Sequence, residues 1–149
     1  MYEPLLFVHA FSAIALMGPA YLLPLVARMR GTPPSVAVLR VEALINRYVG
    51  IFAVVALLSG GWLIGESPLL EDRFGDARWL HVGMTLFFVM VGVGHGFALP
   101  RTRKALAAAE RGEGEQAARL LGPVDRIAGP VLGVLGAVIV YLMVIKPDL

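Results

Sequence analysis

The chain has 149 residues, of which 58% are hydrophobic and only 16% carry a formal charge, and its mean hydropathy is +0.75. This composition excludes an ordinary soluble domain and indicates a lipid environment. The chain has no cysteine, which excludes disulfides, thiolate metal sites and cysteine redox chemistry.

Four apolar segments approach or exceed the roughly 20 residues that a membrane-spanning helix needs. They cover residues 4–27, 48–65, 79–99 and 127–145. The second and fourth are short, so we expect their helices to extend into flanking residues at the membrane interface. The first follows no basic leader, and we expect it to be retained as a span. Together the segments predict one all-α domain over residues 1–149, a polytopic membrane four-helix bundle.

Prolines, a serine and glycines mark local features along these segments. Pro19 and Pro24 are expected to kink the second half of the first span, because each removes a backbone donor. Ser35 is expected to cap a helix that runs into the second span. The alanine-rich stretch 102–121 predicts an interfacial helical hairpin that ends before Pro123. Two glycine pairs have the four-residue spacing that allows close helix approach: Gly61 with Gly65, and Gly129 with Gly133.

Basic residues are unevenly divided between the two sides of the predicted bundle. One side carries ten of them: Arg28, Arg30, Arg40, Arg47, Arg101, Arg103, Lys104, Arg111, Arg119 and Arg126. The other side carries only Arg73, Arg78 and Lys146. Because basic loops stay in the cytoplasm, this predicts a multi-pass plasma membrane protein, in a bacterial cytoplasmic membrane, with both termini outside. The expected surroundings are a lipid bilayer with anionic headgroups, and nucleic acid is not an expected partner.

The three histidines, His9, His81 and His95, all lie within apolar spans. An unpaired polar ring in hydrocarbon costs on the order of several kcal/mol, so each ring needs a partner. Counted along the helices, His9 and His81 reach similar depths on different spans. His95 follows His81 by fourteen positions, which places it on nearly the same helix face but roughly 21 Å deeper.

Two imidazoles at similar depth on different helices are suited to the axial positions of a haem iron. The predicted site has His9 and His81 as metal ligands, Met84 as an alternative axial ligand, and Arg78, with Arg73 nearby, as the partner of the haem propionates. Its cofactor-binding residues are His9, His81, Arg78, Trp79, Met84 and His95. The aromatic residues that could line the porphyrin are Trp62, Trp79, Phe7, Phe87 and Phe88.

Two other classes of function stay open from the residues alone. The chain could handle copper or another metal, although the spans contain no cluster of histidine and carboxylate ligands. It could also be a cofactor-free assembly or structural partner whose histidines only bridge helices. In that case Trp62 and Trp79 are interfacial belt residues and Arg78 is a solvated anchor.

Four short runs of sequence carry a family resemblance: LFVHAFSAIALMGPAYLLPLVAR, LLSGGWLIG, WLHVGMTLFFVMVGVGH and VIKPDL. Their order resembles the HemJ-type protoporphyrinogen oxidases and related predicted integral membrane proteins of unknown function. It more loosely resembles the membrane domain of copper resistance protein D. The HemJ-type resemblance implies a four-helix membrane protein that binds haem b, with His9 as the histidine of the first span. Trp79, His81 and His95 fall on the family positions of the third span.

One position departs from the HemJ-type pattern. The family has a lysine shortly after the tryptophan and histidine, whereas this chain has Gly83. The resemblance therefore implies a haem-binding redox or electron-transfer protein, or a divergent porphyrinogen oxidase, without the lysine that full protoporphyrinogen oxidase activity would use. A porphyrin, a quinone or a redox partner protein is the expected type of partner.

Overall fold

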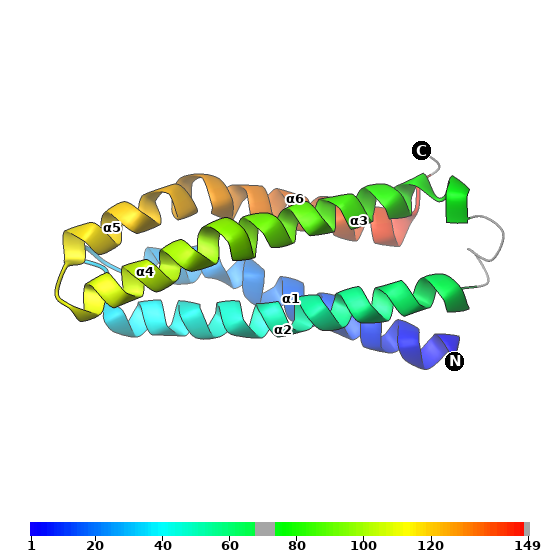
Figure 1. Cartoon of the computed structure of the whole chain (residues 1–149), viewed down its shortest axis with the longest axis horizontal. Helices are drawn as coiled ribbons and strands as arrows, with labels where there is room; N and C mark the ends of the chain where they lie inside the picture. Colours follow the sequence, from blue (N-terminus) through cyan, green and yellow to red (C-terminus); the bar gives the residue numbers. More distant parts are fainter. Residues whose placement is uncertain (68–73, 148–149) are drawn as a thin grey trace.

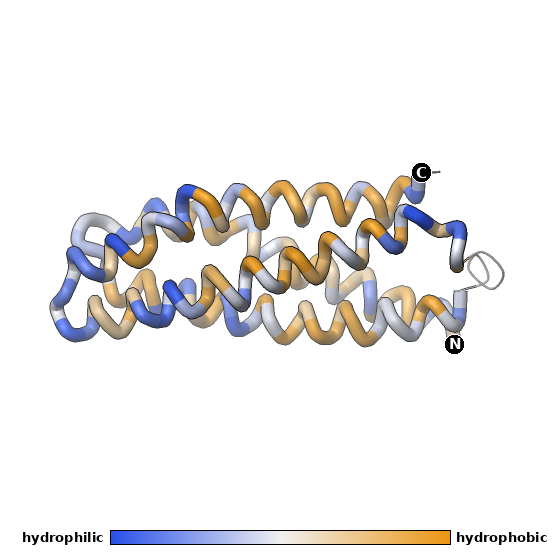
Figure 2. The backbone as a smooth tube through the Cα atoms, turned by 45° about the horizontal axis from the view of Figure 1, so that its top comes forward, coloured by the Kyte–Doolittle hydropathy of each residue, from blue (hydrophilic) through white to orange (hydrophobic). Residues whose placement is uncertain are grey.

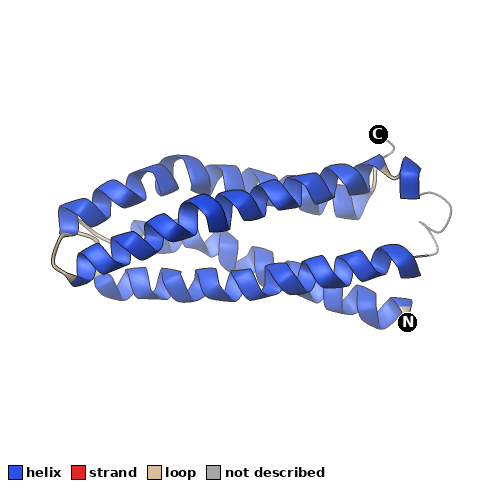
Figure 3. Ribbon diagram, in the orientation of Figure 1, coloured by secondary structure: helices blue, strands red, loops and turns tan. Residues whose placement is uncertain are grey.

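The computed structural model describes residues 1–67 and 74–147, and every regular element within them is helical (Figure 3). The elements are α1 (Tyr2–Arg28), α2 (Val36–Glu66), the short 3-10 helix η1 (Phe74–Asp76), α3 (Arg78–Val91), the π-helix η2 (Gly92–Ala98), α4 (Leu99–Glu110), α5 (Gly114–Pro123), the π-helix η3 (Val124–Ala128) and α6 (Gly129–Ile145). The predicted all-α class is confirmed.

Four continuous helical rods are long and apolar enough to cross a membrane: Tyr2–Arg28, Val36–Glu66, Arg78–Glu110 and Gly114–Ile145. The second and fourth extend beyond the predicted segments, as expected. The helix that begins after Ser35 runs without a break into the second span, although the serine side chain makes no capping hydrogen bond. α1 likewise continues through Pro19 and Pro24.

The predicted hairpin at 102–121 is present, but its end is not where the sequence indicated. α4 ends at Glu110, a turn with Gly112 at φ 81° follows, and α5 begins at Gly114. The expected stop before Pro123 is wrong, because the helix continues through this proline. A proline removes one backbone donor, and the rod changes to the wider π-helical turn of η3 directly after it.

The rods pack in pairs along a long, narrow bundle (Figure 1): α1 lies along α2, α3 along α6, and α4 along α5 and α2. Both ends of the chain lie at one end of the bundle, which we call the terminal end, and the α4–α5 turn lies at the other, the turn end. Hydrophilic residues gather at these two ends, and hydrophobic residues predominate between them (Figure 2).

Two clusters of buried apolar side chains hold the rods together. The central cluster takes one residue from each rod: Leu16, Ala53, Met90 and Ile139. The alanine-rich cluster, nearer the turn end, consists of Leu39, Ala105, Ala108, Ala117 and Leu121. Most other large apolar side chains point outward, as expected where lipid tails surround the helices.

An ion cluster formed by buried Arg30 and Glu42 and exposed Asp125 closes the bundle near the turn end. Arg30, in the α1–α2 connection, donates to both carboxylate oxygens of Glu42 on α2, at 2.6 and 2.8 Å. Its Nη1 also donates to both oxygens of Asp125 on η3, at 2.8 and 2.7 Å. Burial alone would lower the pKa of Arg30, but the hydrogen bonds and charges of the two carboxylates raise it, so the guanidinium stays protonated. One side chain therefore ties a connection to two separate rods.

We expect Arg30→Met to destabilise the bundle by about 3–5 kcal/mol, because it leaves the Glu42 carboxylate buried without its counter-charge. Arg40→Met is the matched control. The Arg40–Glu110 pair is solvent-exposed, and its loss should cost less than about 1 kcal/mol. Denaturant titration in mixed micelles measures both free energies of unfolding, and equal losses would contradict the role given to Arg30.

Candidate functional site

His9 lies half-buried on α1 against α2. Its Nδ1 is 3.0 Å from the carbonyl oxygen of Ala56 and 3.3 Å from Oγ of Ser59. A carbonyl oxygen only accepts, so Nδ1 carries the proton in this bond and Nε2 keeps its lone pair. This is the tautomer that a metal-ligating histidine adopts when a backbone carbonyl fixes its ring.

Small residues on both helices make room for the His9 ring. A Cβ on Gly60 would lie 2.8 Å from Cε1 and 3.1 Å from Nδ1 of His9. Ser12 and Ser59 are buried in the same region, and each hydroxyl donates to a carbonyl of its own helix, Val8 and Val55 respectively, at 2.6 Å. The serines therefore bring no unpaired polar group into the α1–α2 interface.

The glycines that admit neighbouring side chains are not the predicted ones. A Cβ on Gly61, Gly65 or Gly133 would meet nothing within 4 Å outside its own helix. In the fourth rod, Gly136 instead lies against α1. A Cβ on Gly136 would lie 3.1 Å from Sδ of Met17 and 3.3 Å from the hydroxyl oxygen of Tyr21. Glycine spacing could not tell which face of each helix meets a neighbour.

His81 lies in the first turn of α3 and is exposed on the protein surface. Its Nδ1 is 3.0 Å from the carbonyl oxygen of Ala77, one turn earlier, and its ring stacks at a tilt on Phe74 with 4.9 Å between centroids. By the same argument as for His9, Nδ1 is the donor and Nε2 carries the free lone pair. His9 and His81 thus have the same tautomer, with the proton on Nδ1 and the lone pair on Nε2.

His95 has different neighbours and a different depth. It lies in the π-helix η2, and its Nε2 is 2.8 Å from where a Cβ on Gly50 of α2 would stand. Gly50 is ten residues from Gly60, or about 15 Å along α2. His9 and His95 therefore both rest on α2, but at well-separated levels.

The residues predicted to surround a haem lie in several environments. Arg78 is exposed at the start of α3, and Met84 is half-buried one turn beyond His81. Trp79 pairs with Lys146, whose Nζ is 5.7 Å from the ring centroid. Phe87 packs on the central cluster, whereas Phe7, Trp62 and Phe88 are more than half exposed. Arg73 lies outside the described residues.

A family model described as "Predicted integral membrane protein (DUF2269)" matches residues 3–147, nearly the whole chain. The chain belongs to this family. No curated protein and no solved structure matches it. Membership of DUF2269 confirms the predicted relation to integral membrane proteins and is consistent with the HemJ-like resemblance.

In this DUF2269 protein, Gly83 stands where the HemJ-type resemblance implies a lysine, and neighbouring side chains leave no room there for a longer side chain. Gly83 is buried on α3, and a Cβ there would lie 2.7 Å from Cε of Met143 on α6. A longer side chain at this position would have to displace Met143. Met143 therefore occupies the space that a longer side chain at position 83 would need.

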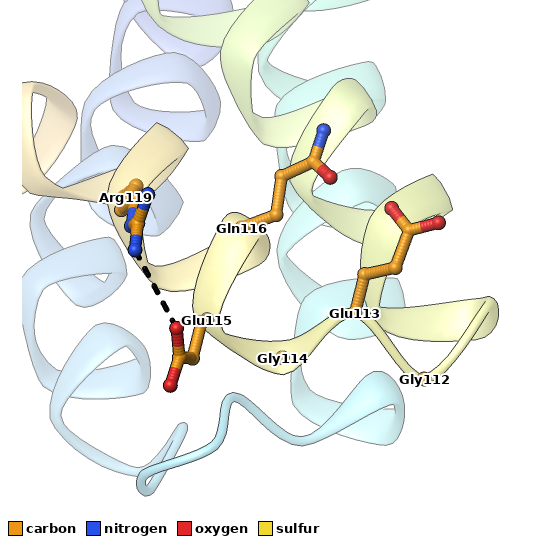
Figure 4. A pocket seen from close by; sticks show the side chains of 6 residues that line it. All are labelled: Gly112, Glu113, Gly114, Glu115, Gln116 and Arg119. Carbon is orange, nitrogen blue, oxygen red and sulfur yellow. Dashed lines mark hydrogen bonds and ion pairs between the residues drawn. The ribbon is translucent and has the colours of Figure 1, made fainter.

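The sequence did not point to the Arg30 cluster or to the two π-helices of this DUF2269 chain. Asp125 lies 95 residues from Arg30 in sequence, and only folding brings it to the Arg30–Glu42 pair. Among the described residues there is no group of three or more histidines, aspartates or glutamates that could hold a metal ion. A polar hollow at the α4–α5 turn (Figure 4) is lined by exposed side chains, including the Glu115–Arg119 pair, and presents no such group.

We expect Gly60→Ala to destabilise the protein by about 1–3 kcal/mol, because the added methyl must push the His9 ring away from Ala56. Gly61→Ala, one position away in open space, should be neutral or stabilising by up to about 1 kcal/mol. Thermal unfolding in detergent distinguishes the two. An unchanged unfolding midpoint for Gly60→Ala would show that His9 does not depend on this close contact.

Proposed function

We propose that this DUF2269 protein binds haem b in the half of the bundle nearest the terminal end, with Nε2 of His9 and of His81 as axial ligands. One observation carries the proposal: both rings donate Nδ1–H to a backbone carbonyl, which leaves both Nε2 lone pairs for iron. His9 belongs to the α1–α2 pair and His81 to the α3–α6 pair, so the ligands come from the two halves of the bundle.

The set of available donors favours haem over a bare metal ion. Porphyrin supplies four ligands, so the protein needs to add only one or two. A bare divalent ion needs about four protein or water ligands, and no group of three histidines or carboxylates occurs in residues 1–67 and 74–147. Copper handling therefore has less support than haem binding.

The surroundings of the two histidines are compatible with this ligand. Arg78, exposed at the terminal end, supplies a cation for a propionate. Haem iron, when bound, exchanges single electrons, and this supports a redox or electron-transfer role with a quinone or protein partner. Gly83 and Met143 supply no cation for an acidic porphyrinogen, so electron transfer has more support than porphyrinogen oxidation.

The protein purified in detergent from haem-replete cells should show a Soret band and the split α and β bands of a reduced bis-histidine haem. His9→Ala and His81→Ala should each abolish or greatly alter these bands, whereas His95→Ala should keep them, because His95 lies on η2 against Gly50, well away from His9. Added imidazole should restore the spectrum of His81→Ala, because this position is exposed.

Three results would count against haem binding by His9 and His81. A colourless, folded protein would select the helix-bridging role for the His9–Ala56 bond. Stoichiometric copper without a Soret band would select metal handling. Spectra that survive both histidine substitutions, in variants whose circular dichroism matches the parent, would place the ligands elsewhere.

We further infer that both termini face outward and the α4–α5 turn faces the cytoplasm, from the ten basic residues assigned to the turn end. The absence of native cysteine makes this simple to test. Gln116→Cys at the turn should be protected from a membrane-impermeant maleimide in intact cells (Figure 4), whereas Gly75→Cys should be labelled. Both positions are exposed, and the reverse pattern would overturn the orientation.

A further inference from the structure

An apolar groove runs between the two π-helical segments of the bundle. Its volume is about 360 Å³, within the range of about 300–1,000 Å³ that is usual for small-molecule sites. It is lined by Gly92, Val93 and Phe97 on η2, Ile127 and Ala128 on η3, and Val131 on α6. None of these side chains is polar, so the groove suits a hydrocarbon chain.

One arginine is held at the end of the groove that faces the turn. The guanidinium carbon of Arg101 lies 3.7 Å from the ring centroid of Phe97, and Nη1 donates to the Phe97 carbonyl at 3.2 Å. Phe97 itself lines the groove. Among the described residues no carboxylate pairs with Arg101, in contrast with Arg30, Arg40 and Arg111. The other guanidinium N–H groups therefore stay available to an anion.

A second arginine stands on the same side. Arg126 directly precedes Ile127, is exposed, and pairs with no carboxylate in the part of the chain that the structure describes. Residues 97 to 101 lead toward the turn end, and residues 131 to 126 lead the same way along the fourth rod. Both cations thus lie on the turn side of an apolar groove.

We propose that the groove holds an acyl chain of an anionic phospholipid whose phosphate binds Arg101 and Arg126. The chain runs from the turn end toward the middle of the bundle, in the direction in which a lipid of that leaflet extends. Charge complementarity selects the occupant: a planar guanidinium already fixed over an aromatic ring matches a phosphate in two hydrogen bonds. A neutral isoprenoid would use the groove but not the arginines. The site is independent of haem binding.

Native mass spectrometry of the whole protein, released from detergent micelles, tests this with equimolar phosphatidylglycerol and phosphatidylcholine that have the same acyl chains. We expect one phosphatidylglycerol to be retained in preference to phosphatidylcholine. Arg101→Gln should lower its apparent affinity by about tenfold, as expected for loss of charged hydrogen bonds. Arg103→Gln, which removes the same charge from another exposed position two residues away, should leave the affinity within about twofold of the parent.

A second pair of variants tests the groove itself. Gly92→Leu fills it, whereas Gly96→Leu places the same side chain on η2 outside it, and a Cβ at either position meets nothing within 4 Å. Only Gly92→Leu should lose the retained lipid. If Arg101→Gln does not fold, this comparison decides the proposal alone.

Equal retention of the two lipids, equal losses in Arg101→Gln and Arg103→Gln, or retention by Gly92→Leu would each overturn the site. Preferential retention of an added neutral quinone over phosphatidylglycerol would also overturn it and would assign the groove to an isoprenoid.

Discussion

Hydrocarbon offers no hydrogen bonds, so each polar atom inside the bundle must find its partner within the protein. Hydroxyl groups on the spans do so by donating to the carbonyl four residues earlier, as Ser12, Ser59 and Thr102 show. Among the described residues, no buried side-chain nitrogen or oxygen lacks a partner. His9 and His81 obey the same constraint through Nδ1. Because a neutral imidazole has two ring nitrogens, a hydrogen bond donated by Nδ1 leaves Nε2 with a free lone pair.

The two ends of the bundle are built by different forces. Near the turn end, Arg30 joins a connection to two rods, and the alanine-rich cluster allows α2, α4 and α5 to approach closely. Such a cluster fixes geometry more than it adds stability, since desolvating Arg30 and Glu42 offsets much of their attraction. Toward the terminal end the rods associate mainly as two pairs. His9 therefore lies on one helix pair and His81 on the other.

At four positions in this architecture, a glycine admits a side chain from another helix. His9 rests on Gly60, His95 on Gly50, Met143 on Gly83 and Met17 on Gly136. In each case a larger residue would have to displace a specific neighbour. Gly83 therefore belongs with the position of Met143 in the packing of α3 on α6.

The sequence by itself determined the four spans, the helical hairpin over 102–121 and membership of a membrane protein family, because hydrophobicity over some 20 residues is a local property. It also singled out His9, His81 and His95 as polar groups in need of partners. Only the tertiary structure decided which partners they have, which glycines face a neighbour, and that Arg30, Glu42 and Asp125 form one cluster. These features depend on helix rotation and on contacts between distant segments. Spacing along one helix does not fix either, since the same pattern can face lipid or protein.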